Sequence, residues 1–115
     1  MYLCLMYSNE LLKGTLKTII LKLLSENGRM YGYEITQRVR ELSGEEIRLT
    51  EGALYPMLHK LEAEGLLSTE KVNYGKRVRK YYTLTSQGNI STHAKLEEFN
   101  NFVKTMQLIL KPKTV

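Results

Sequence analysis

The spacing of apolar residues predicts an amphipathic helix near the beginning of the chain, over about residues 9–26. Ser8 or Asn9 can cap its beginning, and the pair Asn27-Gly28 is a typical helix end. Its apolar residues fall at i, i+4, i+7, i+8, i+11 and i+12: Leu12, Leu16, Ile19, Ile20, Leu23 and Leu24. Positions with this period lie on one face, so we expect one continuous helix that buries this face.

Two shorter helices are predicted next, separated by a tight turn. The first has apolar residues at steps of four, four and three, from Tyr31 to Leu42. The second begins after Thr50, a good N-cap, and is closed by Gly65. Pro56 lies within its first two turns, where the missing N–H matters least. Three short helices joined by tight turns are typical of a helix-turn-helix, whose last helix inserts into a groove of DNA.

The chain after the third helix has a period of two residues, which predicts a β-hairpin. Strands are expected over residues 67–72 and 78–84, separated by a turn segment at residues 73–77. Tyr81 and Tyr82 alternate across the second strand, so we expect one of them to pack inward. Added to the three helices, the hairpin predicts a mainly α fold with a small β-hairpin, a winged helix-turn-helix.

The net charge of +5 is concentrated in this hairpin. Residues 71–82 contain no acid and account for the whole excess through their bases: Lys71, Lys76, Arg77, Arg79 and Lys80. Such a segment attracts polyanions, although charge alone is equally typical of a solvated, lysine-rich surface hairpin. The context has to decide between these interpretations.

The N-terminus of the third helix favours DNA as the polyanion. Gly52 and Ala53 are small enough to allow close approach to the major groove, and the free N–H groups of the first turn attract phosphates. Glu51 is the exception, because an acid repels phosphate. It either caps the helix or accepts a hydrogen bond from a cytosine amino group.

A long final helix is predicted from an N-cap at Thr85 or Ser86 to about Lys111, and a proline follows. Its apolar stripe would leave an exposed patch on a monomer, which a second copy would cover. We therefore expect a homodimer, the alternative being a helix that folds back on its own domain. The expected interface combines the first and last helices: Leu12, Leu16, Ile19, Leu96, Phe99, Phe102, Val103, Met106 and Leu110. Residues 9–85 would form the DNA-binding domain, its first helix shared with the dimer interface, and residues 86–111 the dimerisation helix.

Four segments of the chain carry a highly specific combination of motifs. They are Leu11 to Leu16 (LLKGTL), Tyr31 to Ile35 (YGYEI), Leu49 to Leu66 (LTEGALYPMLHKLEAEGL) and Arg79 to Thr85 (RKYYTLT), ahead of Gly88. Together they resemble the PadR-type transcriptional regulators, specifically the compact subfamily with a single C-terminal helix, over about residues 10–105. The resemblance implies a winged helix that is dimerised by its first and last helices. It also implies repression of a nearby gene from a palindromic operator.

The resemblance further implies which residues contact DNA. Tyr33 would touch the phosphate backbone, and Tyr55 would lie at the groove-facing tip of the recognition helix unless it edges the core. The wing cations join them on the ground of charge, since they can hold the DNA backbone. The expected interface is Tyr33, Thr50, Glu51, Gly52, Tyr55, His59, Lys60, Lys76, Arg77, Arg79 and Lys80.

A small-molecule effector is left open by the sequence. Some PadR-type relatives bind a drug or a phenolic acid at the dimer interface, often stacked on tryptophan. This chain has no Trp, but Tyr7, Phe99 and Phe102 could take its place. A small aromatic effector bound between the subunits and control by protein abundance alone are equally open.

Other functional classes find less support. We expect no enzyme, no cofactor and no metal site, because the chain has no Asp, its two histidines (His59 and His93) are isolated, and no metal-ligand spacing or Ser–His–acid set is present. A winged helix used only for protein contacts is the alternative function, but such an interface would more often mix charges than carry an acid-free wing. An RNA-binding role lacks exposed aromatic platforms for unpaired bases.

The expected location is the cytoplasm, without membrane contact. No apolar run approaches the roughly 18–20 residues needed to cross a bilayer. The apolar residues 1–7 lack the basic region and cleavage site of a signal peptide. Cys4 has no second cysteine to pair with, which fits a reducing compartment, and we interpret it as a small hydrophobe rather than a redox group. Whether residues 1–8 join the dimer interface or are disordered stays open.

Overall fold

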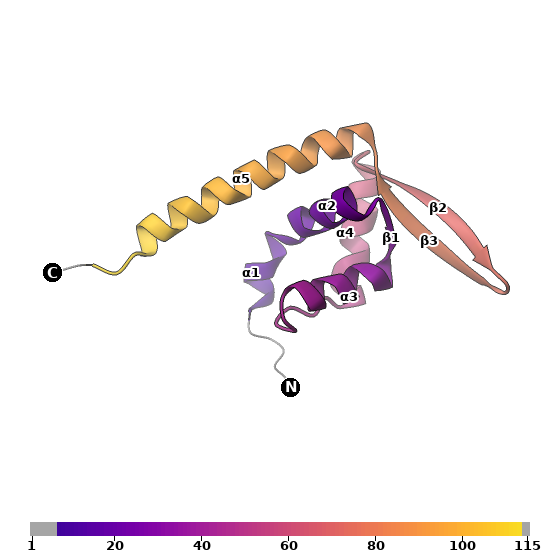
Figure 1. Ribbon diagram of the computed structural model, residues 1–115, viewed down its shortest axis with the longest axis horizontal. Helices are drawn as coiled ribbons and strands as arrows, with labels where there is room; N and C mark the ends of the chain where they lie inside the picture. The colour runs from indigo at the N-terminus through magenta and orange to yellow at the C-terminus, as the bar shows by residue number, and fades with distance from the viewer. Residues whose placement is uncertain (1–6, 114–115) are drawn as a thin grey trace.

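Five helices and one three-stranded antiparallel sheet make up residues 7–113, the part of the chain that the computed structural model describes (Figure 1). The elements are α1 (Asn9–Lys13), α2 (Leu16–Asn27), β1 (Arg29–Tyr31), α3 (Gly32–Leu42), α4 (Glu51–Ala63), β2 (Leu67–Tyr74), β3 (Arg77–Leu84) and α5 (Ser86–Leu110). The predicted class, a mainly helical winged helix-turn-helix with a long C-terminal helix, is confirmed. Cys4 lies outside the described residues, so its role as a small hydrophobe stays a prediction.

The first predicted helix is divided into α1 and α2, so the expectation of one continuous helix over residues 9–26 was wrong. Ser8 caps α1 as expected, but the helix ends after one turn at Gly14. The hydroxyl of Thr15 donates a hydrogen bond to the Leu12 carbonyl at 2.9 Å, which competes with continuation of the helix. Glycine also has a low helix propensity, so the pair Gly14-Thr15 produces a break where the apolar spacing alone predicts none.

The hydrophobic core lies between α2, α3, α4 and the inner face of the sheet. The fully buried large side chains are Ile20, Leu21, Leu24, Ile35, Leu54, Leu58, Leu61 and Tyr82. Burial of an aliphatic side chain of this size is worth roughly 1.5–3 kcal/mol. Three of these leucines belong to α4, so this helix is held firmly by one face and leaves the opposite face to solvent.

The strand β1 was not predicted from the sequence. It pairs antiparallel with β3, with Met30 opposite Tyr82, and the strand order is β1-β3-β2. Three residues are too short to show a period of two, so the pattern could not reveal it. Because β1 runs directly into α3, the sheet joins the helix-turn-helix to the wing, which is the hairpin β2–β3.

Both tyrosines of β3 are buried, although only one was expected to be. Tyr82 packs into the core and is 1% exposed. Tyr81 lies on the opposite face of the sheet and is still only 7% exposed. The Tyr31 ring covers it edge to face at 5.5 Å between ring centres, and the Arg29 guanidinium lies 4.3 Å from its ring centre. Cross-strand neighbours, not the core, therefore bury Tyr81.

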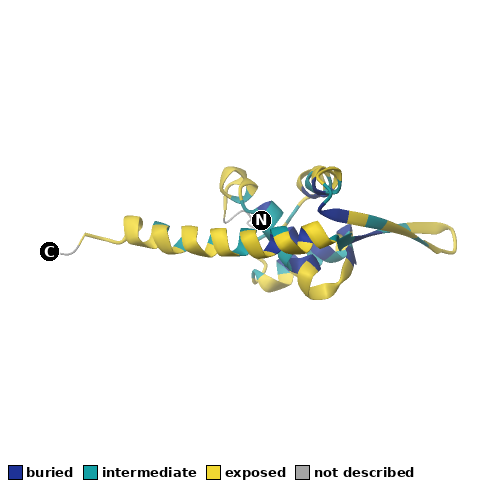
Figure 2. Cartoon of the chain, turned by 90° about the horizontal axis from the view of Figure 1, so that it is seen from above, coloured by how far each residue is buried: buried dark blue, intermediate teal, exposed yellow. Residues whose placement is uncertain are grey.

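The helix α5 is anchored at its beginning and extends beyond the other elements at its far end (Figures 1 and 2). The Thr85 side chain caps it and donates a hydrogen bond to the Gly65 carbonyl at 2.7 Å. Gly88 lies so close to the Leu66 carbonyl that a β-carbon would collide with it. After these first turns α5 packs along α2, and its C-terminal half leaves the body. The radius of gyration is therefore 16.1 Å, against about 13 Å for a compact chain of this length.

Candidate nucleic-acid interface

The recognition helix α4 presents small and polar residues to solvent. The Thr50 hydroxyl caps it by accepting a hydrogen bond from the Ala53 N–H at 3.2 Å. Glu51 therefore is not the cap, and its side chain makes no hydrogen bond within residues 7–113. The exposed residues of the helix are Glu51, Gly52, Ala53, Pro56, His59, Lys60 and Ala63. Pro56, which the sequence did not suggest as a contact, thus lies on the same exposed surface as the predicted ones.

Tyr55 and Tyr33 differ in their exposure. Tyr55 is half-buried, packs against the core at Gly32 and lies with its ring centre 6.4 Å from that of His59. It occupies the edge of the core, which is the alternative that the sequence left open. Tyr33, in the first turn of α3, is 62% exposed and available to a ligand.

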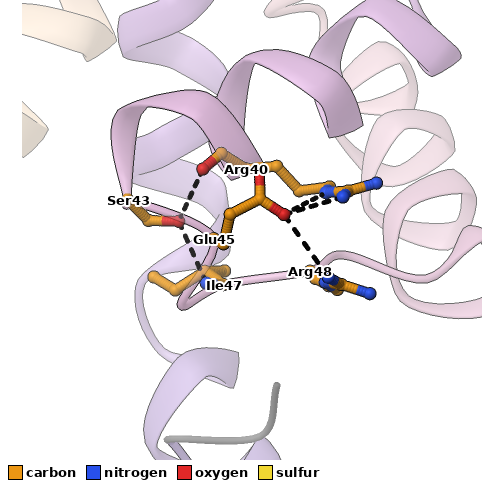
Figure 3. A network of polar contacts seen from close by, with 5 residues as sticks. All are labelled: Arg40, Ser43, Glu45, Ile47 and Arg48. Carbon is orange, nitrogen blue, oxygen red and sulfur yellow. Dashed lines mark hydrogen bonds and ion pairs between the residues drawn. The ribbon is translucent and has the colours of Figure 1, made fainter. Parts of the chain in front are cut away.

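The loop before α4 is held by the Glu45 carboxylate (Figure 3). It accepts hydrogen bonds from Arg40 at 2.7 and 3.2 Å and from Arg48 at 3.3 Å. These partners, Arg40 above all, hold the pKa of Glu45 below its ordinary value. Glu45 has a φ of +71°, a left-handed conformation that residues other than glycine rarely adopt. The two arginines thus stabilise a strained turn that sets the direction in which the chain enters α4.

The tip of the wing carries two cations without a partner in the part of the chain that the structure describes, Lys76 and Arg77. Both are exposed. They follow a two-residue turn closed by the pair Tyr74 and Arg77, in which Gly75 has a φ of +59°, as hairpin turns with glycine in first place require. Lys71 on β2 is also exposed and without a partner there, although it was not among the predicted contacts.

The other two predicted wing cations already have partners within the chain. The Arg79 guanidinium carbon lies 4.3 Å from the centre of the Tyr31 ring and 4.9 Å from that of Tyr74. The Lys80 ammonium lies 3.7 Å from the carboxylate of Glu62 on α4. Both cations are half-buried. The wing therefore presents its freest charges at the tip and uses the next pair in internal contacts.

The residues expected at a dimer interface lie along α1, α2 and α5. Leu16 is only 7% exposed and belongs to the core of its own chain, so it offers little surface to a partner, contrary to expectation. The exposure of the others increases toward the end of α5, where Phe102 is 54% and Leu110 is 74% exposed. The half-buried members are Leu12, Ile19, Leu96, Phe99, Val103 and Met106.

A groove of about 900 Å³ lies between α1, the beginning of α2 and the middle of α5. Its lining includes Tyr7, Phe99 and Phe102, the three aromatic residues that could replace tryptophan in an effector site. The rings of Phe99 and Phe102 have their centres 6.4 Å apart. The groove is mainly apolar, so a helix of a second copy or a small apolar ligand could fill it.

Residues 7–113 contain neither a metal-binding cluster nor a helix suited to a membrane. No three His, Cys, Asp or Glu side chains in this range come together in a way that could hold a metal ion. Among the helices of the same range, none combines the length and the hydropathy that spanning a membrane requires.

Comparison with known proteins connects this surface to gene regulation. The profile of the transcriptional regulator PadR-like family matches residues 20–94, from α2 through the wing to the first turns of α5. The transcriptional regulator Rv3488 of Mycobacterium tuberculosis is 37% identical over 79 residues, which cover 69% of this chain and 70% of that protein. An uncharacterized protein of Lysinibacillus sphaericus is 28% identical over 109 residues, which cover 92% of this chain and 97% of that protein.

Solved structures agree with the family match. A transcriptional regulator from Clostridium thermocellum superposes with a TM-score of 0.82 at 30% identity, over 91% of this chain and 99% of its own. A PadR family regulator from Eggerthella lenta superposes with a TM-score of 0.76 at 30% identity, over 90% of this chain and 88% of its own. The predicted class, a DNA-binding transcriptional regulator and not an enzyme, is confirmed by this relationship. The chain belongs to the PadR-like family of transcriptional regulators.

Proposed function

We propose that this chain is a repressor that binds a palindromic operator as a homodimer, in the cytoplasm, with one recognition helix and one wing from each copy. One observation carries the proposal: the exposed, small-residue face of α4 stands beside a wing whose tip cations have no partner in the described chain. The major groove of B-DNA, about 12 Å wide, admits one helix of this kind.

The two parts of the interface have different tasks in this proposal. The exposed end of α4, with Thr50, Glu51 and Gly52, reads bases, and His59 and Lys60 extend the contact along the groove. Tyr55 supports this surface from the edge of the core. The cations of the wing tip bind phosphates and supply affinity for any duplex, as does the exposed Tyr33 hydroxyl by hydrogen bonding to the backbone.

The dimer is supported by the apolar surface of α5. Its far half carries Phe102 and Leu110 in the open, and a single chain has no element left to cover them. A second copy related by a two-fold axis buries these residues and presents two recognition helices to two half-sites. Occupation of an operator by such a dimer blocks polymerase sterically, which makes repression the simplest outcome.

A small aromatic effector is the regulatory part of the proposal. The groove that contains Phe99, Phe102 and Tyr7 supports it, because a flat apolar ligand finds three rings there. Such a ligand releases DNA only if it binds one dimer shape more tightly than the other, commonly by about 1–3 kcal/mol. Thermal-shift screening of phenolic acids and planar aromatics, followed by operator release, tests this part by itself.

Salt-dependent binding to a random duplex tests the DNA interface. The wild-type chain is compared with the double variant Lys76→Gln/Arg77→Gln at the wing tip. The matched control, Lys104→Gln/Lys113→Gln, removes the same charge from exposed residues far from the wing. We expect the tip variant to bind more weakly, because each phosphate that it no longer neutralises reduces the log–log salt slope by about 0.9. The control is expected to keep the wild-type slope.

Two results contradict the proposal. A wild-type chain whose binding to duplex DNA is undetectable at low salt is not a DNA-binding protein of the proposed kind. Equal slopes for the tip variant and the control would show that the wing tip does not contact phosphate. The second result would favour a winged helix used for protein contacts.

A further inference from the structure

The outer face of the sheet carries a connected series of aromatic and charged side chains. Side chains alternate along β3, so Arg77, Arg79 and Tyr81 point away from the core to which Tyr82 belongs. The register places Tyr31 of β1 directly opposite Tyr81, on the same outer face. The strands thus bring together residues of the helix-turn-helix and of the wing that are far apart in the sequence.

Arg79 occupies the centre of this series. Its guanidinium lies between two rings, 4.3 Å from the centre of Tyr31 and 4.9 Å from that of Tyr74. The hydroxyl groups of Tyr74 and Tyr81 are 3.1 Å apart and hydrogen-bonded. The Tyr74 hydroxyl and then Arg79 keep the pKa of Tyr81 below its ordinary value. Charge and rings are therefore in direct contact, which is the geometry of cation–π stacking.

The two rings belong to different parts of the interface. Tyr31 is the N-cap residue of α3, where its backbone N–H donates to the Glu34 carboxylate at 3.1 Å. Tyr74 is the last residue of β2, immediately before the turn that presents Lys76. A side chain stacked on both rings connects the beginning of α3 with the tip of the wing.

The wing needs such a connection because its outer half has little other support. β1 pairs with β3 only from Tyr81 to Thr83, so beyond Tyr81 the wing is a two-stranded ribbon that extends away from the helices (Figure 1). An isolated two-stranded ribbon is marginally stable in water. On the inner face, the contact between Lys80 and Glu62 is the corresponding tie to α4. On the outer face, Arg79 is the residue in this place.

We propose that Arg79 is a positioning residue: stacked between Tyr31 and Tyr74, it holds the wing at a fixed angle to the helix-turn-helix and so places Lys76 and Arg77 on the DNA backbone. This inference rests on the proposed function and assigns Arg79 a role other than the phosphate contact expected from its charge. A planar guanidinium can stack on two rings at once, whereas the compact, strongly hydrated ammonium of lysine is a poor substitute.

The charge-conserving substitution Arg79→Lys separates the two roles. Lysine keeps the charge that a phosphate contact needs and lacks the flat surface that stacking needs. Arg77→Lys is the matched control, because Arg77 lies two residues away on the same face, is exposed and stacks on no ring in the described chain. A second pair, Tyr74→Leu and Tyr74→Phe, removes the ring or keeps it without changing any charge.

Hydrogen exchange of residues 71–80 in the free protein is the first readout. We expect Tyr74→Leu to speed exchange by roughly two- to fivefold, the factor that one exposed cation–π contact corresponds to. Arg79→Lys has an effect at least as large, and Arg77→Lys and Tyr74→Phe exchange like the wild type. Combining Tyr74→Leu with Arg79→Lys adds little to either alone, because both remove the same interaction.

Affinity for a random duplex is the second readout. Arg79→Lys and Tyr74→Leu weaken binding although the net charge is unchanged, and Arg77→Lys does not. If Arg79→Lys matches Arg77→Lys in both exchange and affinity, the inference is overturned and Arg79 is an ordinary cation. If the wild type binds no duplex, the proposed function falls instead, and exchange in the free protein still shows whether Arg79 holds the wing.

Discussion

The ring of Tyr55 on α4 lies directly on the backbone of Gly32 at the start of α3, so closely that a β-carbon on Gly32 would collide with it. The two helices of the helix-turn-helix therefore meet through a ring and a residue without a side chain. This contact fixes how the second turn of α4 sits on α3. It also explains why Tyr55 is half-buried at the edge of the core.

Gly32→Ala tests this contact. The added methyl group forces the Tyr55 ring or the helix to move, and overpacking of this kind costs about 1–3 kcal/mol of unfolding free energy. Denaturant unfolding measures the decrease. The double variant Gly32→Ala/Tyr55→Ala is expected to be destabilised by less than the sum of the two single variants, because the space for the methyl group is then available. Gly14→Ala is the control, since its β-carbon meets nothing within 4 Å. Strict additivity at the first site would show that the contact does not matter.

Gly52→Ala separates DNA binding from stability. The nearest atom to a β-carbon at Gly52 is the Thr50 hydroxyl oxygen, 3.9 Å away, so the fold accommodates the methyl group. Alanine favours a helix more than glycine, and the melting temperature is expected to stay equal or to rise slightly. In the major groove the methyl group occupies the space needed for close approach, so affinity for the operator falls. Fluorescence anisotropy against operator and random duplexes checks this. Unchanged operator affinity would place the beginning of α4 outside the groove.

Local signals in the sequence were sufficient for α4 and α5. Thr50 and Thr85 cap their helices through the predicted side-chain hydrogen bonds, and both helices begin where those residues indicate. Cap residues act within one turn, so they can be recognised without knowledge of the fold. The break between α1 and α2 is local too, but the apolar stripe continues across Gly14-Thr15 and concealed it.

The partners of the wing cations could not be predicted from the sequence. Charge alone placed Arg79 and Lys80 with Lys76 and Arg77, as equal candidates for phosphate contacts. Their difference depends on residues that the fold brings from elsewhere: Tyr31 across the sheet and Glu62 on α4. Tyr31 reaches Arg79 only because of β1, a strand too short for its pattern to be recognised.

Met106→Glu tests the dimer. Met106 lies on the apolar stripe of α5, and a carboxylate there would be buried in the proposed interface, once in each copy, at a cost large enough to separate the subunits. Thr105→Glu adds the same charge to the neighbouring exposed residue and leaves the stripe intact. Sedimentation at micromolar concentration is expected to show dimers for the wild type and Thr105→Glu, and monomers for Met106→Glu. A monomeric wild type, or a fully dimeric Met106→Glu, is incompatible with this interface.

Acid is expected to weaken the turn before α4 through Glu45. Arg40 and Arg48 hold the pKa of Glu45 below its ordinary value of 4.5, so the folded state favours the ionised carboxylate. The stabilisation is fully present above the unfolded-state pKa and is lost as the pH falls through the lowered folded-state pKa. Glu45→Gln lacks it at every pH. Denaturant unfolding from neutral pH to about pH 3 is expected to show a gap between wild type and Glu45→Gln that closes in acid. A constant gap would contradict the ion pairs of Figure 3.

Selection of duplexes from a random pool by the wild-type protein tests the central claim most directly. A homodimer with one recognition helix in each copy is expected to enrich an inverted repeat whose half-site centres lie about one helical turn, roughly 34 Å, apart. Mutation of either half-site then weakens binding to a similar extent, since the two copies are equivalent. Enrichment of a single unpaired half-site, or of no sequence at all, would contradict a dimeric regulator that reads DNA through α4.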